Sequence, residues 1–210
     1  MELRVASLVQ AAQGAGEDRA EVIQTAVGTV IVVADGAGGM GGGAGAAEAV
    51  VNTFRARHPT ATAITTTGYG AEALLELDDE LSAAPAGGQS TAVVLAIGQG
   101  LIVGASVGDS EAWLISNRGY RALTAAQART PLIGSGGAVP RAFKTSAMPC
   151  RLLVATDGLF RYASPESICG AARTPELDRA ITALLDAVRL PSGTLQDDVA
   201  IVVCELRQVT

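Results

Sequence analysis

The middle of the chain contains three short apolar runs separated by turns of only three residues. The runs are residues 91–97, 101–107 and 111–115, and the turns between them are Gly-Gln-Gly and Gly-Asp-Ser. Connections this short join antiparallel neighbours, because a parallel pair of strands requires a crossover of a dozen or more residues. The sequence therefore predicts antiparallel strands in the middle of the chain.

Further strands and several helices are expected on both sides of this central part. Runs rich in β-branched and aliphatic residues predict strands in residues 3–9, 21–34 (divided by a turn near Gly28), 151–155 and 199–206. Composition and spacing predict helices in residues 44–57, 71–83, 165–172 and 175–188. Two helices thus interrupt the strands, and two more precede the last strand.

The length and the apolar content of the chain favour one domain with a large core. Apolar residues make up 49% of the 210 residues but aromatic residues only 3%, so the core must consist of Val, Leu, Ile and Ala. A chain of this length fits one mixed domain, and we find no internal repeat. We therefore expect a single domain, residues 1–210, in which two sheets pack face to face with helices outside.

Charge and hydropathy exclude several classes of function. A net charge of −6 and a pI near 4.8 argue against a nucleic-acid partner, whose phosphates require a basic surface. No stretch of about 18 apolar residues is present to span a membrane, and residues 1–18 lack the features of a signal peptide. Three scattered cysteines form no CxxC pair and are expected to be reduced. We expect a cytoplasmic protein with no nucleic-acid or membrane partner.

Acidic residues recur where the predicted strands begin or end. The set comprises Glu17, Asp18, Asp35, Asp109, Asp157, Asp197 and Asp198. Several carboxylates gathered at one rim repel one another unless a cation neutralises them. Oxygen ligands without His or Cys suit Mg²⁺ or Mn²⁺ better than Zn²⁺. The single histidine, His58, is interpreted as a helix-end residue and leaves few routes to acid–base catalysis, so metal-activated water fits the remaining groups.

The acidic residues belong to motifs that together carry a family resemblance. The motifs, in chain order, are Gly16-Glu17-Asp18, Asp35-Gly36-Ala37-Gly38-Gly39, Gly88-Gln89-Ser90-Thr91-Ala92, Gly108-Asp109-Ser110, Pro131-Leu132-Ile133-Gly134, Thr156-Asp157-Gly158-Leu159 and Asp197-Asp198-Val199-Ala200. In this order they resemble the motifs of the metal-dependent protein phosphatases, the type 2C serine/threonine phosphatases, and the chain resembles a short, divergent bacterial-type member. Each motif alone is weak, whereas the ordered set spans nearly the whole chain.

The resemblance implies a fold, a reaction and a set of ligands. The implied fold is an α+β, four-layer αββα sandwich of two mainly antiparallel sheets flanked by helices. The implied activity is hydrolysis of phosphoserine and phosphothreonine in proteins by a water bridging two divalent cations, Mn²⁺ or Mg²⁺. By this resemblance, Asp35 would bridge both metals and Gly36 would offer its carbonyl as a ligand. Asp157 and Asp197 would complete the coordination of one metal. Glu17 and Asp18 would act through water on the other side, and Asp109 would belong to an optional third-metal site. The expected partner is a phosphoprotein substrate of a bacterial serine/threonine kinase.

Three positions depart from the pattern of that family. Gln13 stands where many members have an arginine that holds the substrate phosphate, and Ala37 replaces the histidine that some members use as a proton donor. Arg161 stands four residues after Asp157, where a third-metal carboxylate is common. Its guanidinium can donate to a substrate phosphate or pair with a nearby carboxylate. The mobile segment beside the site is shortened to about residues 124–143.

Two other functions remain open from the sequence. The same fold can serve as a catalytically weak regulatory or binding module that has lost its hold on phosphate. The run Gly36–Gly41 also fits the G-x-G-x-x-G pattern of dinucleotide-binding proteins, with residues 61–67 as the following strand. That pattern requires an acidic residue about 20 positions later, where this chain has Arg55 and Arg57. The run Asp78-Asp79-Glu80 is interpreted as a solvated helix face.

Overall fold

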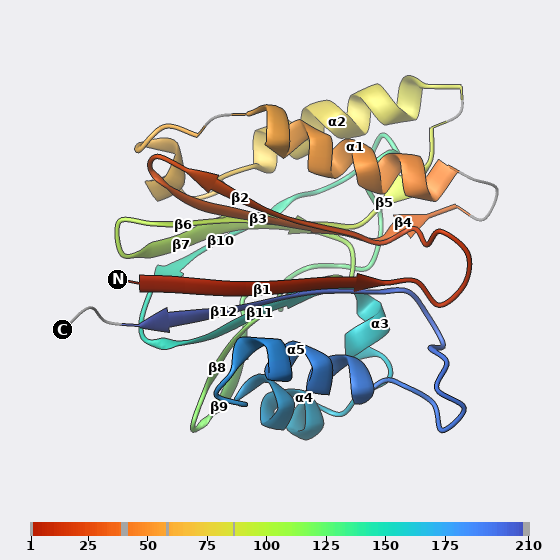
Figure 1. The fold of residues 1–210 in the computed structure, drawn as a ribbon. Coiled ribbons are helices and arrows are strands. Elements are labelled where there is room, and N and C mark those ends of the chain that lie inside the picture. The colour runs from red at the N-terminus through yellow and green to blue at the C-terminus, as the bar shows by residue number, and fades with distance from the viewer. Residues whose placement is uncertain (1, 39–41, 58, 86, 208–210) are drawn as a thin grey trace.

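Two antiparallel five-stranded sheets pack face to face in the computed structural model of the chain, which describes residues 2–38, 42–57, 59–85 and 87–207 (Figure 1). The first sheet has the order β1 (Glu2–Gln10), β12 (Val199–Arg207), β11 (Cys150–Ala155), β8 (Glu111–Ser116) and β9 (Gly119–Ala122). The second has the order β10 (Arg141–Ser146), β7 (Leu101–Val107), β6 (Ala92–Gly98), β3 (Gly28–Ala34) and β2 (Arg19–Thr25). A short pair, β4 (Gly36–Ala37) with β5 (Gln89–Ser90), lies beside them.

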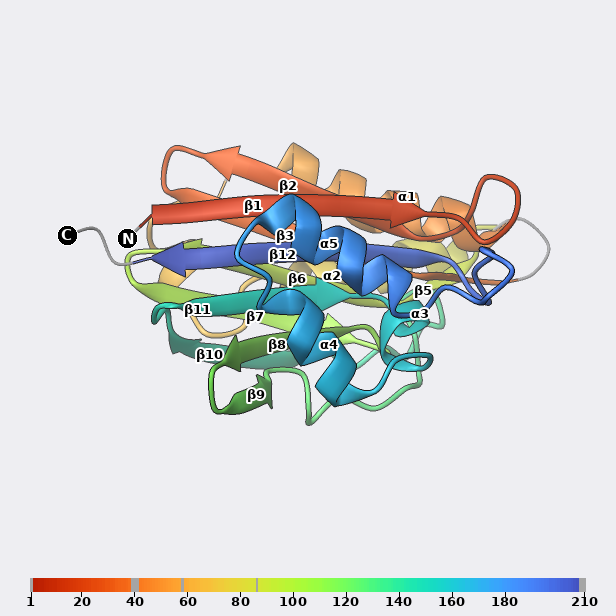
Figure 2. The same ribbon diagram turned by 60° about the horizontal axis from the view of Figure 1, so that its bottom comes forward.

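Helices cover the outer face of each sheet. α1 (Gly42–Ala56) and α2 (Ala71–Ala83), with the 3₁₀ turn Ala63–Thr65, pack on the second sheet, whereas α4 (Pro165–Ala172) and α5 (Leu177–Asp186) pack on the first. Figure 2 shows α4 and α5 lying over the first sheet. The one-turn helix α3 (Asp157–Phe160) follows β11 directly. The predicted α+β, four-layer αββα sandwich is confirmed.

The central strands are apolar on both sides because both of their faces are buried. In β3, Val30 and Val32 face the α1–α2 layer, whereas Ile31 and Val33 face the other sheet, and all four are at most 1% exposed. β12 alternates in the same way, with Ile201 and Val203 toward α5. Strands buried on two faces give continuous aliphatic runs, and such runs made β3, β6, β7 and β12 recognisable from sequence.

Several elements were missed because they lack such runs. β9 and β10 are the outermost strands of their sheets, and four of the six residues of β10 are exposed, so polar side chains dominate them. β4 and β5 are two residues each. The predicted helix 175–188 is shorter, at Leu177–Asp186. His58 and the run Gly39–Gly41, on which two interpretations rested, lie outside the described residues. None of the helices in the described residues is long and apolar enough to span a membrane.

Asp78 corrects the interpretation of residues 78–80 as a solvated face. The side chain is only 3% exposed and lies under the loop that connects β9 to β10. Its carboxylate accepts hydrogen bonds from the backbone N–H groups of Gly134 (2.7 Å), Gly136 (3.0 Å) and Ala138 (2.9 Å). The sequence contained no signal for this role, because the acceptor on α2 and the donors in the loop are more than 50 residues apart.

Replacement of Asp78 tests how firmly this loop is held. In Asp78→Ala, three backbone donors lose their acceptor, so we expect the free energy of unfolding to fall by about 3 kcal/mol or more, since each group left unsatisfied costs about 1–3 kcal/mol. Urea denaturation measures this change. Asp79→Ala, at the adjacent exposed position, is the control and should stay within about 0.5 kcal/mol of the wild type. Equal losses in the two variants would contradict the assignment.

Candidate metal centre

The acidic residues identified from sequence lie at one end of the sandwich. In the first sheet, Ala155 at the end of β11 is paired with Ile201 near the start of β12 and with Glu111 at the start of β8. In the second sheet, Val107 at the end of β7 is paired with Ala92 at the start of β6. Antiparallel pairing thus brings the loops that carry the acidic residues to the same edge, where both sheets contribute side chains.

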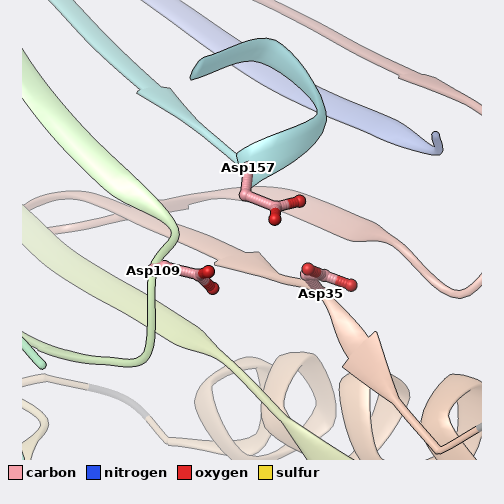
Figure 3. Close-up of side chains that lie close together, drawn as sticks. All are labelled: Asp35, Asp109 and Asp157. Carbon is pink, nitrogen blue, oxygen red and sulfur yellow. The ribbon is translucent and has the colours of Figure 1, made fainter. Parts of the chain in front are cut away.

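Three of these carboxylates gather most closely. One oxygen from each of Asp35, Asp109 and Asp157 lies within 4.8 Å of the others. Figure 3 shows the three side chains coming from separate segments, after β3, after β7 and at the start of α3. All three residues are half-buried. The spacing and the oxygen-only donor set suit a hard divalent cation.

Asp35 is fixed through its backbone. Its N–H donates to Oγ1 of Thr91 (3.0 Å), and its carbonyl accepts from the N–H of Thr91 (2.8 Å) and the hydroxyl of Ser90 (3.0 Å). The Thr91 hydroxyl in turn lies 2.6 Å from that of Ser110, the residue after Asp109. The motifs at residues 88–92 and 108–110 therefore hold the backbone around Asp35 and Asp109.

Asp18 connects the two sheets beneath the three aspartates. It is 2% exposed, and its Oδ2 accepts a hydrogen bond from the Thr156 hydroxyl at 2.7 Å. The same hydroxyl accepts from the N–H of Ala200 at 2.9 Å. Asp18 also lies within hydrogen-bonding reach of the Asp35 carboxyl group. The buried Thr156 hydroxyl thereby fixes the position of a carboxylate that comes from the opposite sheet.

Burial and mutual repulsion make these carboxyl groups weak acids in the metal-free protein. Burial, followed by the charges of Asp18 and Asp157, raises the pKa of Asp35 to about 9. Burial raises the pKa of Asp18 to about 7, opposed by the hydrogen bond from Thr156. The pKa of Asp157 is also raised, first by burial and then by the charge of Asp109. A bound cation would remove this penalty, so the residues present fit a metal centre.

Two arginines lie against the aspartates. Arg161 places Nη1 3.3 Å from Oδ2 of Asp157 and 3.5 Å from Oδ2 of Asp197. Arg129, in the loop after β9, places Nε 2.7 Å from Oδ2 of Asp109 and Nη2 4.0 Å from Oδ2 of Asp157. Sequence reasoning missed Arg129, because it belongs to none of the motifs and lies in a loop of irregular structure. Its only signal was its place in the shortened segment 124–143.

The remaining predicted residues lie around this group. Asp197 is on the rim, paired with Arg161. The Glu17 carboxylate lies against the backbone of Gly43 in the first turn of α1, so the structure does not bring it into the group of three. Asp198 was noted only as part of a motif; its two oxygens accept the N–H groups of Ala12 (2.8 Å) and Glu17 (2.6 Å) and so hold the loop that carries Asp18.

The glycines after two of the aspartates permit close backbone packing. A Cβ added at Gly36 would collide with the carbonyl of Gly43 in α1, and one at Gly158 would collide with the carbonyl of Asp198. The Asp-Gly pairs thus let the segments that carry Asp35 and Asp157 approach their neighbours. A carbonyl ligand from Gly36 stays a prediction.

The dinucleotide-binding interpretation is wrong for this fold. That site requires a parallel strand–helix–strand unit, whereas every strand pair in the described part of the chain is antiparallel. Residues 61–67, the strand expected on that interpretation, contain the 3₁₀ turn Ala63–Thr65 instead.

The raised pKa values predict how the stability of the metal-free protein depends on pH. Asp18 and Asp35 keep protons in the folded state up to about pH 7 and 9, whereas in the unfolded chain they lose them near 3.8. The folded state therefore binds more protons across this range, and the free energy of unfolding should fall as pH rises from about 4 to 9. Each kcal/mol lost lowers Tm by roughly 2–4 °C in a chain of this size.

Thermal melts in a chelating buffer check this dependence. Asp35→Asn should flatten the pH profile, and Mn²⁺ added at pH 8 should raise Tm of the wild type by mass action. A Tm that rises steadily between pH 5 and 9 without metal would contradict the proposed cause.

Similar proteins were found by comparison of structures and not by comparison of sequences. No protein-family model matches the sequence, and no curated protein matches it. The crystal structure of the Mycobacterium tuberculosis serine/threonine phosphatase PstP/Ppp matches with a TM-score of 0.80 and 18% identity, covering 98% of this chain and 99% of that one. The catalytic domain of PstP in complex with two manganese ions matches at 0.78 and 19%, covering 98% and 99%.

A third match supports the same assignment of fold. The S. agalactiae serine/threonine phosphatase matches with a TM-score of 0.80 and 18% identity, covering 98% of this chain and all of that one. At identities this low, the matches establish the fold of the chain only, and its chemistry has to be argued from its own residues. The chain has the fold of the bacterial serine/threonine phosphatases over almost its whole length.

Proposed function

We propose that this chain is a metal-dependent phosphatase that hydrolyses phosphoserine and phosphothreonine in proteins. The observation that carries the proposal is the convergence of Asp35, Asp109 and Asp157 within 4.8 Å at one end of this fold. When ionised, five aspartates (18, 35, 109, 157 and 197) against two arginines leave an excess of three negative charges, which favours the binding of divalent cations. The proposed ions are Mn²⁺ or Mg²⁺, with an optional third.

The proposed roles follow from the position of each side chain. Asp35, central and fixed by Thr91, would contact both ions, with Asp157 and Asp197 on one side and Asp18 with Glu17 on the other through water. When bound, the two ions would lower the pKa of a water and offset negative charge on the substrate phosphate. The rigid strand ends keep the carboxylates in place as substrate enters, because their backbone is set by the sheets.

Arg129 and Arg161 are the proposed contacts for the substrate phosphate. Both line a cleft of about 410 Å³ that also contains Asp109, Asp157 and Phe160. The side chains of Arg129 and Arg161 are 68% and 44% exposed, so each can exchange a carboxylate partner for a phosphate oxygen. They would take over the role that Gln13, an exposed loop residue without a charge, does not perform.

A second candidate function is favoured by the same ion pairs. The guanidinium groups of Arg129 and Arg161 form ion pairs with Asp109, Asp157 and Asp197, which would otherwise be free to bind cations. A catalytically weak regulatory or binding module of the same fold, which has lost its hold on phosphate, would show this arrangement. Turnover of p-nitrophenyl phosphate and of a phosphothreonine peptide with Mn²⁺ separates the two: a folded protein that releases phosphate from neither compound favours the module. We also propose that the substrate is phosphorylated by a bacterial serine/threonine kinase and that this protein is cytoplasmic.

Replacement of Asp35 tests the metal centre. Asp35→Asn removes the central negative charge, so we expect Mn²⁺-dependent release of phosphate to fall more than tenfold while the protein stays folded. Because burial and repulsion by Asp18 and Asp157 disfavour a charge at this position, the metal-free variant should melt at or above the wild-type Tm at pH 8. Turnover above one tenth of the wild type, with a normal melting curve, would refute the role of Asp35.

Replacement of the two arginines tests phosphate recognition. Arg129→Ala and Arg161→Ala should each lower kcat/KM for a phosphopeptide about tenfold, a change of roughly 1.4 kcal/mol in transition-state stabilisation. Gln13→Arg should partly restore activity to Arg161→Ala. Arg179→Ala, at an exposed position on α5, is the matched control. Unchanged kinetics in both variants would leave phosphate held by the metals alone.

A further inference from the structure

A second polar cleft lies at the opposite end of the sandwich. It has a volume of about 810 Å³ and is formed by the turn between β8 and β9, the start of β11, the end of β12 and residues that follow α4. Figure 1 shows these segments at the end where the two termini lie, away from α3. Arg151 is the second residue of β11 and Asp157 comes two residues after its end, so the two sites are about 20 Å apart at 3.3 Å per extended residue.

Four of the five charged residues that line this cleft are arginines. The charged residues among its lining are Arg118, Arg151, Arg173, Arg207 and Glu205. The chain as a whole carries a net charge of −6, so this concentration of positive charge is local. We refer to this group of five residues as the arginine cleft.

Arg151 forms the buried floor of the arginine cleft and is not fully satisfied. The residue is only 9% exposed. Its Nη2 donates to the carbonyls of Thr174 (3.0 Å) and Pro175 (2.8 Å) and lies 3.4 Å from Oε1 of Glu205. Its Nη1 is buried without a hydrogen-bond partner in the part of the chain that the structure describes. Buried unpaired donors are rare in native proteins, and a bound ion or water commonly accounts for them.

Negative charge in the arginine cleft is too little to balance its arginines. Glu205 is shared by Arg151 and Arg207 (2.9 Å), and it also contacts Arg4 of the neighbouring strand (3.4 Å). Arg173 donates to the neutral carbonyl of Ser116. The Arg118 guanidinium makes no hydrogen bond or ion pair with any residue that the structure describes. A concave wall of one charge focuses the field and attracts counter-ions.

We propose that the arginine cleft binds a small phosphate-bearing anion. Guanidinium groups match phosphate oxygens in pairs, and Arg151 is held in place by the two carbonyls that it contacts. The exposed side chains of Arg118, Arg173 and Arg207 can close over an anion from the rim. The volume lies within the range of small-molecule sites. The inference is independent of the proposed hydrolysis, because it involves none of the residues of the metal centre.

Binding of inorganic phosphate tests the proposal on the full chain. A chelating buffer removes binding that depends on metal, but Arg129 and Arg161 stay available at the other end, so binding is assigned to the arginine cleft by its loss in rim variants. We expect saturable binding by calorimetry and a rise in Tm of about 3 °C or more at a phosphate concentration tenfold above Kd. Arg118→Gln and Arg207→Gln should each weaken Kd about tenfold, whereas Arg179→Gln on the outer face of α5 should leave it unchanged.

Two outcomes would overturn the proposal. One is a rise in Tm that potassium chloride of equal ionic strength reproduces in full. The other is a phosphate Kd that is the same in Arg118→Gln and Arg207→Gln as in the wild type. A glucose phosphate ester tested beside inorganic phosphate distinguishes free phosphate from an esterified one as the ligand: tighter binding of the ester, lost in the two rim variants, supports the proposal. Both rim positions are exposed, so these variants should fold, which melting curves check.

Discussion

The packing of the two sheets against each other determines where the aspartates of the candidate metal centre lie. The layer between them consists of aliphatic side chains such as Ile31, Leu95 and Val202, all fully buried. Burial of this surface supplies the main stabilisation of the fold, since each large aliphatic side chain contributes about 1.5–3 kcal/mol. That stabilisation is what permits carboxylates from both sheets to be held together at one end, although they repel each other.

Like charges are gathered at both ends of the sandwich, with aspartates at one end and arginines at the other. At the acidic end, burial raises the pKa values of Asp18 and Asp35, and the cost is relieved by a proton or by a cation. At the other end, Arg151 is buried with a single carboxylate that other arginines share. A guanidinium does not deprotonate, so only an anion can offset its charge. The neighbouring strands β11 and β12 have aspartates beside one end and arginines at the other, and their antiparallel pairing places the candidate metal centre and the arginine cleft at opposite ends of the first sheet.

The loop between β9 and β10 contacts α2 and β5 and carries Arg129 to the candidate metal centre. It is held at one point by Asp78 and at another by Ile133, whose N–H and carbonyl pair with Ser90. Ser90 also donates to the carbonyl of Asp35. The loop therefore contacts the same strand that fixes the central aspartate, and it carries Arg129 to Asp109. The position of this arginine depends on contacts made by α2 and β5, which are distant in sequence.

The sequence by itself determined the layered fold, because doubly buried strands require aliphatic runs, and it indicated Asp35, Asp109 and Asp157, because each comes within two residues of the end of such a run. Arg161 was singled out by the family resemblance, because it stands four residues after Asp157 where a carboxylate is common. Only the tertiary structure decided that Glu17 lies against α1, that Asp78 is buried, and that Arg129 and Arg151 face charged clusters. These contacts join polar side chains that are far apart in the chain. Hydrophobic periodicity indicates which face of an element is buried, but it does not indicate which partner a charged side chain contacts.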